Sequence, residues 1–373
     1  MKVLILSCNT GGGHNSAARA ISAELEGRGI YSHIKNAMEF VPKAKQDFIE
    51  KGHSFMYKYA PDIYGRVYER TEQLERHRML YIDYAQFALP LAQYIKRRGY
   101  DTVICVHEFP AFMLTAARKL FGLKVKQYFV ATDYALTPGI EETLMDAWFV
   151  PKGFAAEYAG AGLPEDRIFE TGIPVDSVFY SHPDRDDVRR RLGLRDDLPV
   201  IIVAAGSIGC GPIEELVDEL RKRKGTDAVI AVMCGKNRSL LRAFMYGRSD
   251  AFLIPLGFVD NVPDWFAAGD VLITKPGGLS TTEAASAGIP MVFMNAVPGL
   301  ETHNLEYFTS HGCGCYAVGV SELCDGVDIA YAKRKTYLKN QKKLFSSNSV
   351  RELTDTVISG VAESQENLPE GRT

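Results

Sequence analysis

Short, continuously apolar runs alternate with longer amphipathic stretches along most of the chain. Runs of this kind predict strands buried on both faces of a parallel sheet, and the amphipathic stretches between them predict helices. The pattern therefore predicts an α/β fold. The runs cover residues 3–8, 102–106, 126–130 and 147–150 in the first half of the chain, and 199–204, 227–233, 251–255, 271–274 and 291–294 in the second.

The first helix illustrates how the pattern defines an element. After the first apolar run, Asn15 or Ser16 can cap a helix, and Gly27 or Gly29 can end it. Small and aliphatic residues recur at helical spacing between these limits, so one face of the helix is expected to be buried. The predicted buried face consists of Ala17, Ala18, Ile21 and Leu25.

A change in composition divides the chain. Residues 171–187, "TGIPVDSVFYSHPDRDD", are rich in proline, polar and charged residues and are typical of a linker, with a boundary near Asp176. Both sides of this linker show the same architecture, so we expect an N-terminal domain at 1–175 and a C-terminal domain at 176–345. Residues 346–373 are expected to form a serine-capped helix that packs back across both domains, followed by a tail. The apolar face of that helix would carry Val350, Leu353, Val357 and Val361.

The composition limits the classes of function. Apolar residues make up 46% and charged residues 24%, as in soluble globular proteins, and the net charge of −3 gives no reason to expect a nucleic-acid partner. No apolar run is long enough for a membrane span, and the N-terminus lacks the pattern of a signal peptide. The seven cysteines form no CxxC pair, which fits reduced thiols in the cytoplasm. We expect Cys313 and Cys315 to be structural residues.

The segment "ITKPGGLSTTEAASAGIPMVF", residues 273–293, predicts a strand, a glycine loop and the start of a helix. A helix N-terminus offers N–H donors and a partial positive charge, and Gly277 and Gly278 would let a phosphate approach those donors. Ser280 and Thr281 lie at the same helix start. Glu283 follows in the first turn, where its carboxylate could hold two sugar hydroxyls. The alternative is a simple turn followed by a favourable early glutamate.

Two further loops follow predicted strands of the C-terminal half. In "AAGSIGCGPIEEL", residues 204–216, the N–H groups of Gly206, Ser207 and Gly209 could face a diphosphate. The spacing does not fit GxGxxG, which weakens a dinucleotide-dependent oxidoreductase. In "PLGFVDNVPDWFAAGDVLIT", residues 255–274, the backbone of Gly257 and Phe258 could pair with a base edge. Open α/β sheets bind ligands at the carboxyl ends of their strands, where all three loops are expected to lie.

Both halves of the chain resemble one family. "GFVDNVPDWFAAGDVLITKPGGLSTTEAASAGIP" and the following "PGLETHN" closely resemble the nucleotide-sugar half of glycosyltransferases with two Rossmann-like domains, the GT-B type. The group most similar contains the monogalactosyldiacylglycerol synthases and processive diacylglycerol glucosyltransferases. The peptidoglycan lipid-linked N-acetylglucosaminyltransferases are more distant. The opening "TGGGHNSAA" resembles the start of the same glycolipid synthases, so the resemblance extends over approximately residues 1–345.

The resemblance implies a UDP-sugar site in the C-terminal domain. Phe258 and its neighbours would receive the uracil ring, and Glu283 would bind the ribose hydroxyls. Glu301 and Asn304 would reach the hydroxyls of the donor sugar. The diphosphate would lie against the glycine loops and the helix start, at Gly206, Ser207, Gly277, Gly278, Ser280 and Thr281.

The resemblance also implies inverting transfer, with His14 as the general base that takes the proton of the acceptor hydroxyl. Three successive glycines are costly in conformational entropy, so Gly12 and Gly13 predict a close approach of the backbone at this helix start. The helix N-terminus disfavours an imidazolium and would keep the base neutral. A histidine that caps the loop or touches a phosphate is the alternative. His107 and Asp133 would orient His14 or the acceptor, or have a structural role.

Some residues depart from the family pattern. Leu300 stands in "PGLE" where related glycolipid synthases often have glutamine, and leucine cannot hydrogen-bond a sugar, so the donor hexose stays open. Glu108 follows His107 where relatives often have proline, and Thr137 stands where they often have histidine. "DRD" at residues 184–186 resembles a metal-binding motif, but its context favours an exposed helix start. Helix dipoles and N–H donors can neutralise a diphosphate, so no metal or other cofactor is expected.

Residues 48–98 combine aromatic and methionine side chains with basic ones. This combination suits an anionic membrane surface, although acidic residues in the same segment make the excess of positive charge modest. An apolar core helix is the alternative. The basic residues are Lys51, Lys58, Arg66, Arg70, Arg76, Arg78, Lys96, Arg97 and Arg98.

These motifs predict a cytoplasmic enzyme that associates peripherally with the inner face of the cell membrane. It would transfer glucose or galactose from a UDP-sugar to diacylglycerol or a glycosyl-diacylglycerol, with inversion at the anomeric carbon. One alternative is transfer to another lipid-linked or small hydrophobic acceptor. A UDP-sugar sensor without turnover and a UDP-sugar epimerase are the others.

Overall fold

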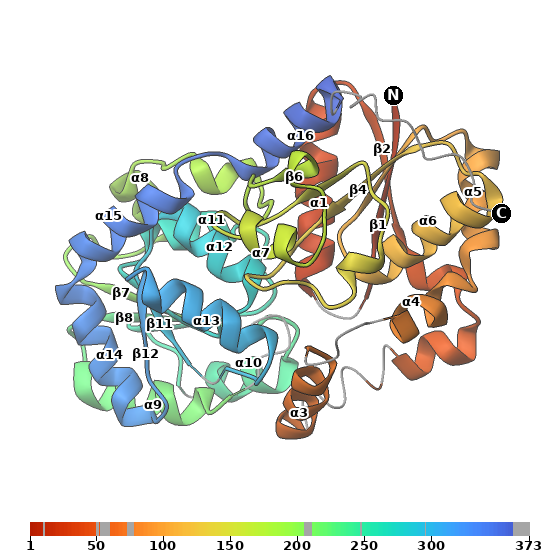
Figure 1. The fold of residues 1–373 in the computed structure, drawn as a ribbon. Helices are drawn as coiled ribbons and strands as arrows, with labels where there is room; N and C mark the ends of the chain where they lie inside the picture. The colour runs from red at the N-terminus through yellow and green to blue at the C-terminus, as the bar shows by residue number, and fades with distance from the viewer. Residues whose placement is uncertain are drawn as a thin grey trace.

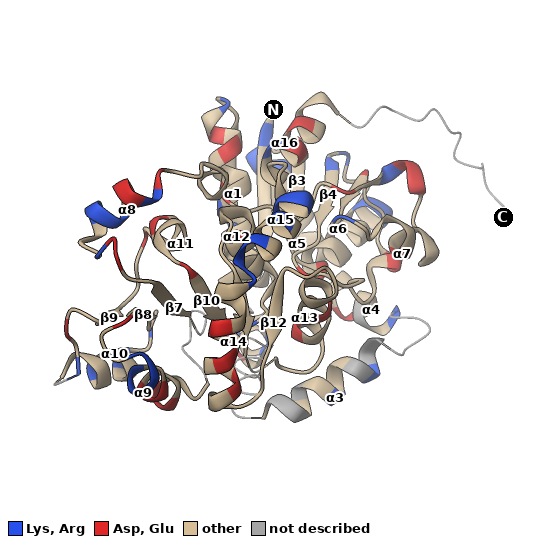
Figure 2. Cartoon of the chain, turned by 90° about the vertical axis from the view of Figure 1, so that its left-hand side faces the viewer, with Lys and Arg blue, Asp and Glu red and all other residues tan. Residues whose placement is uncertain are grey.

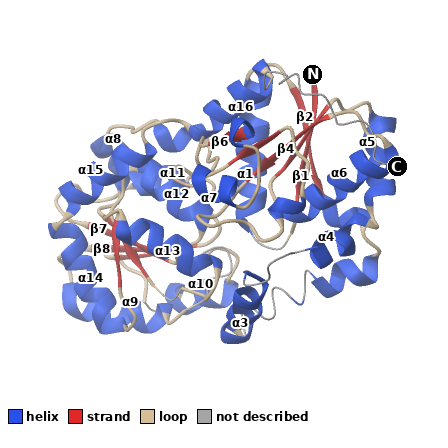
Figure 3. Cartoon of the chain, in the orientation of Figure 1, coloured by secondary structure: helices blue, strands red, loops and turns tan. Residues whose placement is uncertain are grey.

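The computed structural model describes residues 1–9, 12–49, 52, 60–72, 78–204, 211–246, 248–294 and 296–360. These residues form two lobes, each built on a parallel sheet of six strands that is covered by helices (Figure 1, Figure 3). The strand order is β2-β1-β3-β4-β5-β6 in the N-terminal lobe and β12-β11-β10-β7-β8-β9 in the C-terminal lobe. The predicted α/β architecture with two Rossmann-like sheets is therefore confirmed.

All nine predicted strands are present, and three further ones complete the sheets. The strands that the apolar pattern missed are β2, β6 and β12, and each lies at or beside the edge of its sheet. β2 carries polar residues on its exposed side, as an edge strand can, whereas β6 and β12 are only two and three residues long and form no distinct apolar run. The strands are β1 (Lys2–Ser7), β2 (Tyr31–Asn36), β3 (Thr102–Cys105), β4 (Lys126–Val130), β5 (Ala147–Phe149), β6 (Ile168–Phe169), β7 (Val200–Ala204), β8 (Val229–Met233), β9 (Leu253–Leu256), β10 (Val271–Thr274), β11 (Met291–Phe293) and β12 (Gly314–Tyr316).

Helices connect the strands and cover both sheets (Figure 1). The N-terminal lobe contains α1 (Gly12–Gly27), η1 (Ala37–Phe40), α3 (Pro61–Glu72), α4 (Arg78–Ala85), α5 (Ala88–Arg98), α6 (Glu108–Phe121), η2 (Ile140–Glu142), α7 (Ala155–Gly160) and η3 (Glu165–Arg167). The linker and the C-terminal lobe contain η4 (Ser177–Tyr180), α8 (Arg185–Leu192), α9 (Ile213–Lys224), α10 (Arg238–Met245), α11 (Val262–Ala268), α12 (Gly278–Ala287), α13 (Leu300–Ser310), α14 (Val320–Ala332), α15 (Arg334–Phe345) and α16 (Ser349–Ser359).

One apolar core joins the two lobes. Side chains alternate across a strand, so Leu4 of β1 packs in the outer core of the N-terminal lobe, whereas Val3 packs in the inner core. In the C-terminal lobe, Ile201 of β7 belongs to the outer core and Ile202 to the inner core. The inner core contains residues from both sheets together with α1, α12 and α16. The N-termini of α1 and α12 are thereby brought to the junction of the lobes.

Helix α1 begins earlier than its polar residues predicted. It starts at Gly12, so Asn15 and Ser16 lie inside it and neither is its cap. The Asn15 side chain instead accepts a hydrogen bond from Ser7 Oγ at 2.7 Å and donates one to Asn9 Oδ1 at 2.9 Å. The asparagine therefore ties the helix to the end of β1. The predicted apolar face of α1 is buried as expected.

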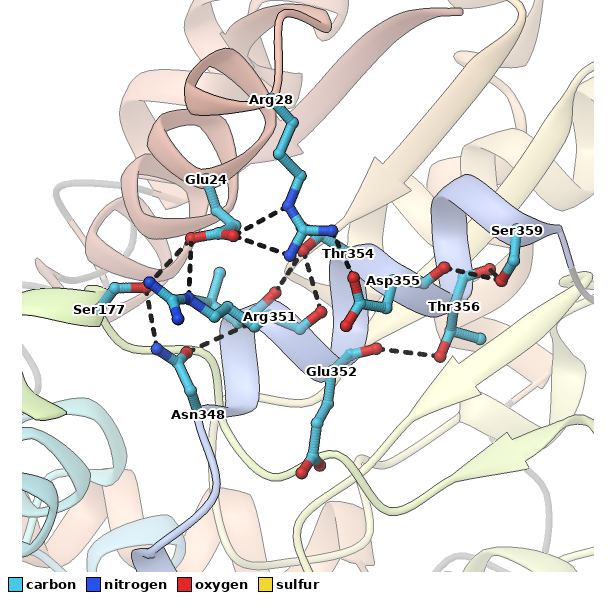
Figure 4. A network of polar contacts seen from close by, with 11 residues as sticks. Glu24, Arg28, Ser177, Asn348, Arg351, Glu352, Thr354, Asp355, Thr356 and Ser359 are labelled. Carbon is cyan, nitrogen blue, oxygen red and sulfur yellow. Dashed lines mark hydrogen bonds and ion pairs between the residues drawn. The ribbon is translucent and has the colours of Figure 1, made fainter.

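Helix α16 returns from the C-terminal lobe and lies against α1 (Figure 1, Figure 4). Asn348, rather than the predicted serine, caps it by accepting from the N–H of Arg351 at 3.3 Å. Ser349 Oγ donates to the carbonyl of Ile173 at 2.7 Å, which ties the helix to the linker between the lobes. Val361, predicted on the apolar face, lies outside the described residues. The buried apolar residues of α16 are Val350, Leu353 and Val357.

Polar contacts surround this apolar face (Figure 4). Glu24 of α1 forms an ion pair with Arg28 at 2.8 Å and accepts from Ser177 Oγ at 3.1 Å. Asn348 donates to the same serine oxygen at 3.0 Å, and Arg28 also pairs with Asp355. Partly exposed ion pairs contribute little stability, so the apolar residues hold α16 and the polar contacts determine its orientation.

Candidate active site

His14 lies in the first turn of α1 and is partly buried. Its Nδ1 is 2.9 Å from the carbonyl oxygen of Val106 and 3.0 Å from Thr132 Oγ1. A carbonyl oxygen can only accept a hydrogen bond, so Nδ1 carries the hydrogen and the ring lone pair lies on Nε2. This is the tautomer that a general base requires, with the hydrogen on Nδ1 and the lone pair on Nε2.

His107 packs against His14, with ring centroids 4.5 Å apart. It is buried and caps α6, where its Nδ1 lies 3.3 Å from the N–H of Phe109 and 2.8 Å from Glu108 Oε2. Burial alone would raise the pKa of Glu108, but the attraction and the hydrogen bond of His107 outweigh it, and the pKa lies below its ordinary value. Nδ1 makes one of these hydrogen bonds at a time: without a hydrogen it accepts from the Phe109 N–H and caps α6, and with one it donates to the Glu108 carboxylate.

The first turn of α12 has the predicted form of a glycine loop that enters a helix. Gly277 is the N-cap residue, and the Ser280 hydroxyl donates to its carbonyl at 3.2 Å. The hydroxyl of Thr281 is fully buried and donates to the same carbonyl at 2.8 Å. In this conformation the Thr281 hydroxyl is therefore used within the helix. Only the backbone of Thr281 remains to support the predicted contact with a diphosphate.

The two helix starts meet across the lobes. A Cβ on Gly13 would lie 3.5 Å from the side chain of Leu279 in the first turn of α12. A Cβ on Gly278 would lie 2.2 Å from the carbonyl oxygen of Thr132 and 2.7 Å from Asp133 Oδ1. No side chain fits in that space, so Gly278 is required by the contact with the N-terminal lobe. This reason for a glycine is distinct from the approach of a phosphate, which the sequence suggested.

Asp133 sits at the same contact. It accepts from Asn304 Nδ2 at 2.9 Å and from the backbone N–H of Gly278. Burial raises its pKa to about 6, and the nearby Glu301 carboxylate adds to the rise, while these hydrogen bonds oppose it. The carboxylate of one lobe is thus held by N–H donors of the other.

Glu283 lies in the second turn of α12, not in the first as predicted, because the helix already begins at Gly278; its side chain is partly buried. Burial raises its pKa to about 7, and the charge of Asp176 adds to the rise, whereas Arg19 of α1 opposes it. A carboxyl group kept away from water, with a single cation near it, binds a partner at low desolvation cost. The role of Glu283 in holding ribose hydroxyls stays a prediction.

We expect Glu283→Gln to stabilise the ligand-free protein while weakening UDP binding. The pKa of Glu283 is about 7 in the folded protein and 4.5 ordinarily, so stability is lost as pH rises from about 4.5 through 7. Glutamine removes this loss, and the Tm of the variant should exceed that of the parent by a few °C at pH 8 and match it at pH 4.5. Calorimetric titration with UDP should show about tenfold weaker binding, since one acceptor oxygen is lost.

The control for this variant is Glu306→Gln, an exposed glutamate of α13. Its Tm and UDP affinity should follow those of the parent at both pH values. Equal Tm values for Glu283→Gln and the parent at pH 8 would show that Glu283 carries no burial cost.

The other predicted donor residues are placed as follows. Phe258 is 66% exposed just after β9, with Lys236 Nζ 6.0 Å from its ring centre. Glu301 is buried and accepts from the N–H of Val297 at 2.7 Å. Asn304 is fully buried, and its amide bonds Asp133 and the N–H of Tyr134 across the lobes. Both thus hold protein groups in this conformation, and their contacts with a donor sugar stay predictions.

Several sequence-derived candidates lie outside the site or outside the described residues. Gly206 and Ser207 are not among the described residues, so their predicted contact with a diphosphate stays a prediction. Asp184 caps α8 by accepting from the N–H groups of Asp186 and Asp187, which confirms the helix-start interpretation of this segment. Among the described residues, no three His, Cys, Asp or Glu side chains gather as a metal site would require.

Sequence reasoning missed some residues that the fold brings to this junction. Thr132 contacts His14, and Arg19 approaches Glu283. Tyr134 OH lies 2.7 Å from Thr282 Oγ1 of α12. The one usable signal was the position of Thr132 and Tyr134 directly after a strand, because ligands bind at that end of a parallel sheet.

Comparison with known proteins supports the resemblance inferred from the motifs. Residues 14–175 match the family model of monogalactosyldiacylglycerol (MGDG) synthase. The processive diacylglycerol β-glucosyltransferase of Bacillus licheniformis is 25% identical over 365 residues, which cover 95% of this chain and 94% of that protein. The protein of the same name from Staphylococcus epidermidis is 25% identical over 355 residues, covering 93% and 88%.

Solved structures show the same fold. MurG of Acinetobacter baumannii superposes with a TM-score of 0.61 at 15% identity, covering 96% of this chain and 99% of that one. HepE of Anabaena in complex with UDP-glucose gives a TM-score of 0.55 at 13% identity, covering 96% and 100%. The fold is therefore GT-B. Along nearly its whole length this chain is similar in sequence to processive diacylglycerol β-glucosyltransferases, and its N-terminal part is similar to monogalactosyldiacylglycerol synthases.

Proposed function

We propose that this chain is an inverting UDP-sugar hexosyltransferase that acts on diacylglycerol or a glycosyl-diacylglycerol, with His14 as its general base. The observation that carries the proposal is the position of His14, whose Nδ1 is held by Val106 while its helix start packs on the first turn of α12. A base of one lobe thus lies beside the helix N-terminus of the other lobe, where a diphosphate would bind.

The proposed reaction follows from this arrangement. His14 Nε2 takes the proton of the acceptor hydroxyl as the oxygen forms a bond to the anomeric carbon. The bond from that carbon to the diphosphate breaks on the opposite face, and UDP leaves with the bonding electrons. The N–H donors at the start of α12 stabilise the charge that develops on the leaving diphosphate. Packing of the two lobes excludes water, which limits hydrolysis of the donor.

Glucose is the better supported donor sugar. The relatives that match nearly the whole chain are named glucosyltransferases, whereas the family model named for galactolipid synthesis matches residues 14–175. Those residues belong to the N-terminal lobe, while the donor sugar would be read by the C-terminal lobe. The acceptor is less constrained, because Glu108 and Thr137 depart from the family pattern on the acceptor side.

Incubation with labelled UDP-glucose or UDP-galactose, with and without diacylglycerol vesicles, tests the proposal. Formation of a labelled glycolipid that depends on diacylglycerol supports it. Transfer to another lipid-linked or hydrophobic acceptor would replace the acceptor assignment. Conversion of one donor into the other without an acceptor would indicate an epimerase, and UDP-sugar binding without any product would indicate a sensor.

We also propose that α3 faces an anionic membrane surface. Ile63 and Val67 of α3 are 50% and 52% exposed, and Arg66 and Arg70 of the same helix are exposed beside them. Basic side chains also gather on α8, α9 and α15 of the C-terminal lobe (Figure 2). These helices lie outside residues 48–98, the segment for which the sequence predicted membrane contact. Exposed apolar and basic residues on one helix are typical of interfacial binding. Within the described part of the chain, every helix is too short or too polar to span a bilayer.

The double variant Arg66→Gln/Arg70→Gln should bind anionic vesicles about 30-fold more weakly. Each basic residue near such a surface contributes about 1 kcal/mol, so two lost charges cost about 2 kcal/mol. Sedimentation with vesicles of mixed neutral and anionic phospholipid at low salt measures the change. The matched control is Lys342→Gln/Lys343→Gln at the exposed end of α15. Equal losses for the two pairs would remove α3 from the proposed membrane surface.

A further inference from the structure

A chain of hydrogen bonds links the proposed base to the opposite lobe. Thr132 Oγ1 lies 3.0 Å from His14 Nδ1 and 3.4 Å from Asp133 Oδ2. Asp133 Oδ1 accepts from Asn304 Nδ2 at 2.9 Å, and Asn304 belongs to α13 of the C-terminal lobe. Asn304 is therefore connected to His14 through the Asp133 carboxylate and then the Thr132 hydroxyl.

The direction of each hydrogen bond follows from the chemistry of the groups. His14 Nδ1 carries its hydrogen, which the Val106 carbonyl and the Thr132 hydroxyl oxygen share. The Thr132 hydroxyl then directs its own hydrogen to the Asp133 carboxylate, which can only accept when ionised. The negative charge of Asp133 thereby favours a positive charge on the His14 ring through one intervening hydroxyl.

The loop that carries Thr132 and Asp133 is locked into the C-terminal lobe by further contacts. The backbone of Tyr134 donates to Asn304 Oδ1 at 2.8 Å, and its hydroxyl bonds Thr282 Oγ1 at 2.7 Å. Its ring stacks on that of Tyr307 of α13, with centroids 4.1 Å apart. The space against Gly278 admits no extra atom. The position of Thr132 relative to His14 therefore depends on the two lobes being packed together.

We propose that Thr132 and Asp133 are positioning residues that align His14 only when Asn304 of the opposite lobe is docked on them. This inference rests on the proposed role of His14 as the base, and it assigns to Asn304 a task other than contact with the donor sugar. A hydroxyl linked to a carboxylate orients the imidazole and stabilises the imidazolium that forms as the acceptor loses its proton. In an open molecule the loop loses its contacts with Asn304, Gly278 and Thr282. Thr132 and Asp133 then no longer hold the His14 ring in its orientation. The donor is then protected from attack until the lobes close.

Thr132→Val removes the hydroxyl with almost no change of shape, and Thr132→Ser keeps it. We expect the valine variant to lose about tenfold in kcat with UDP binding unchanged, and the serine variant to retain most of the activity. The valine variant also loses the hydrogen bond by which the Thr132 hydroxyl stabilises the His14 imidazolium, which lowers the pKa of His14. The acid limb of the pH profile of kcat/KM should therefore move to lower pH. The other titratable groups near His14 are His107 and Glu108 from the turn after β3 and Asp133 from the loop after β4. They are the same in both variants. A valine variant with the parent's kcat and acid limb would overturn the proposal.

A double-mutant cycle tests the link to the opposite lobe. If Asn304 acts through Thr132, the variant Asn304→Ala should lower kcat, and its effect should be almost absent in the Thr132→Val background. A role of Asn304 in holding the donor sugar predicts instead a raised KM for UDP-glucose and additive losses. Additive losses would overturn the coupling. If Asn304→Ala does not fold, Asp133→Asn, which preserves the volume, takes its place in the cycle.

Failure of this inference can be told apart from failure of the proposed function. Turnover that survives in His14→Ala would remove the base and the inference with it. Turnover that is lost in His14→Ala but unchanged in Thr132→Val would leave the base in place and remove only the positioning role.

Discussion

His14→Ala is expected to lower kcat by about 10³-fold while the Kd for UDP stays within twofold of that of the parent. Positioned general bases contribute about 10²- to 10⁴-fold, and a hydroxyl is a poor nucleophile until its proton is taken. His14 has the required geometry, with Nδ1 held at 2.9 Å by the Val106 carbonyl and the lone pair on Nε2. UDP binding should survive because its proposed contacts lie on α12 and the loops of the C-terminal lobe. Steady-state kinetics with UDP-glucose and diacylglycerol, together with calorimetric titration of UDP, measure both quantities.

His33→Ala is the control for this variant. His33 lies on β2, where its ring packs on that of Tyr100, so its loss should leave kcat unchanged. A His14→Ala enzyme that turns over at a rate within threefold of the parent would exclude His14 as the base. Parallel loss of UDP binding would favour the alternative that His14 contacts a phosphate.

Gly278→Ala should abolish most of the activity by preventing the lobes from packing. The added Cβ would lie 2.2 Å from the Thr132 carbonyl oxygen, a backbone atom that cannot rotate away. Real Cβ contacts are never so short, so α12 and the loop after β4 must separate. We expect kcat to fall at least 30-fold, and small-angle scattering should show a larger radius of gyration. UDP should still bind, since the remaining N–H groups at the start of α12 are unchanged.

The adjacent Gly277 offers a matched control. A Cβ at this position would meet only the Ser280 side-chain oxygen, at 3.3 Å, and a small shift of that hydroxyl can relieve the contact. Gly277→Ala should therefore leave the radius of gyration unchanged. Equal loss of UDP binding in the two variants, without opening of the molecule, would show that both glycines serve the phosphate and that the interlobe contact is secondary.

The apolar pattern was sufficient to predict the central strands of both sheets. Val200–Ala204 and Val271–Thr274 are flanked on both sides by other strands and covered on both faces, so they must be continuously apolar. The edge strand Tyr31–Asn36 was missed because an edge strand carries polar residues on its exposed side. The start of α1 was misplaced because Asn15 resembles a cap, although Ser7 holds it inside the helix.

The candidate site was predictable only in part. The glycine loops and His14 stood out because they follow apolar strands and open helices, a local arrangement that the chain reveals by itself. Thr132 follows a strand and Arg19 lies on a helix, but both placements are so common that neither residue stood out from the sequence. Their importance arises from neighbours more than 100 positions away, namely His14 for Thr132 and Glu283 for Arg19.

By itself, the sequence determined the class of fold, the parallel character of the sheet in each half, and the chemistry available at the ends of the strands. These features depend on the burial of each short segment and on backbone freedom at glycines, which are local properties. Only the tertiary structure decided which groups of the two halves meet. Asp133 lies on Asn304, and Gly278 lies on Thr132, because a shared inner core presses α1 and α12 together. A contact between distant segments depends on how whole layers pack, and no local pattern records it.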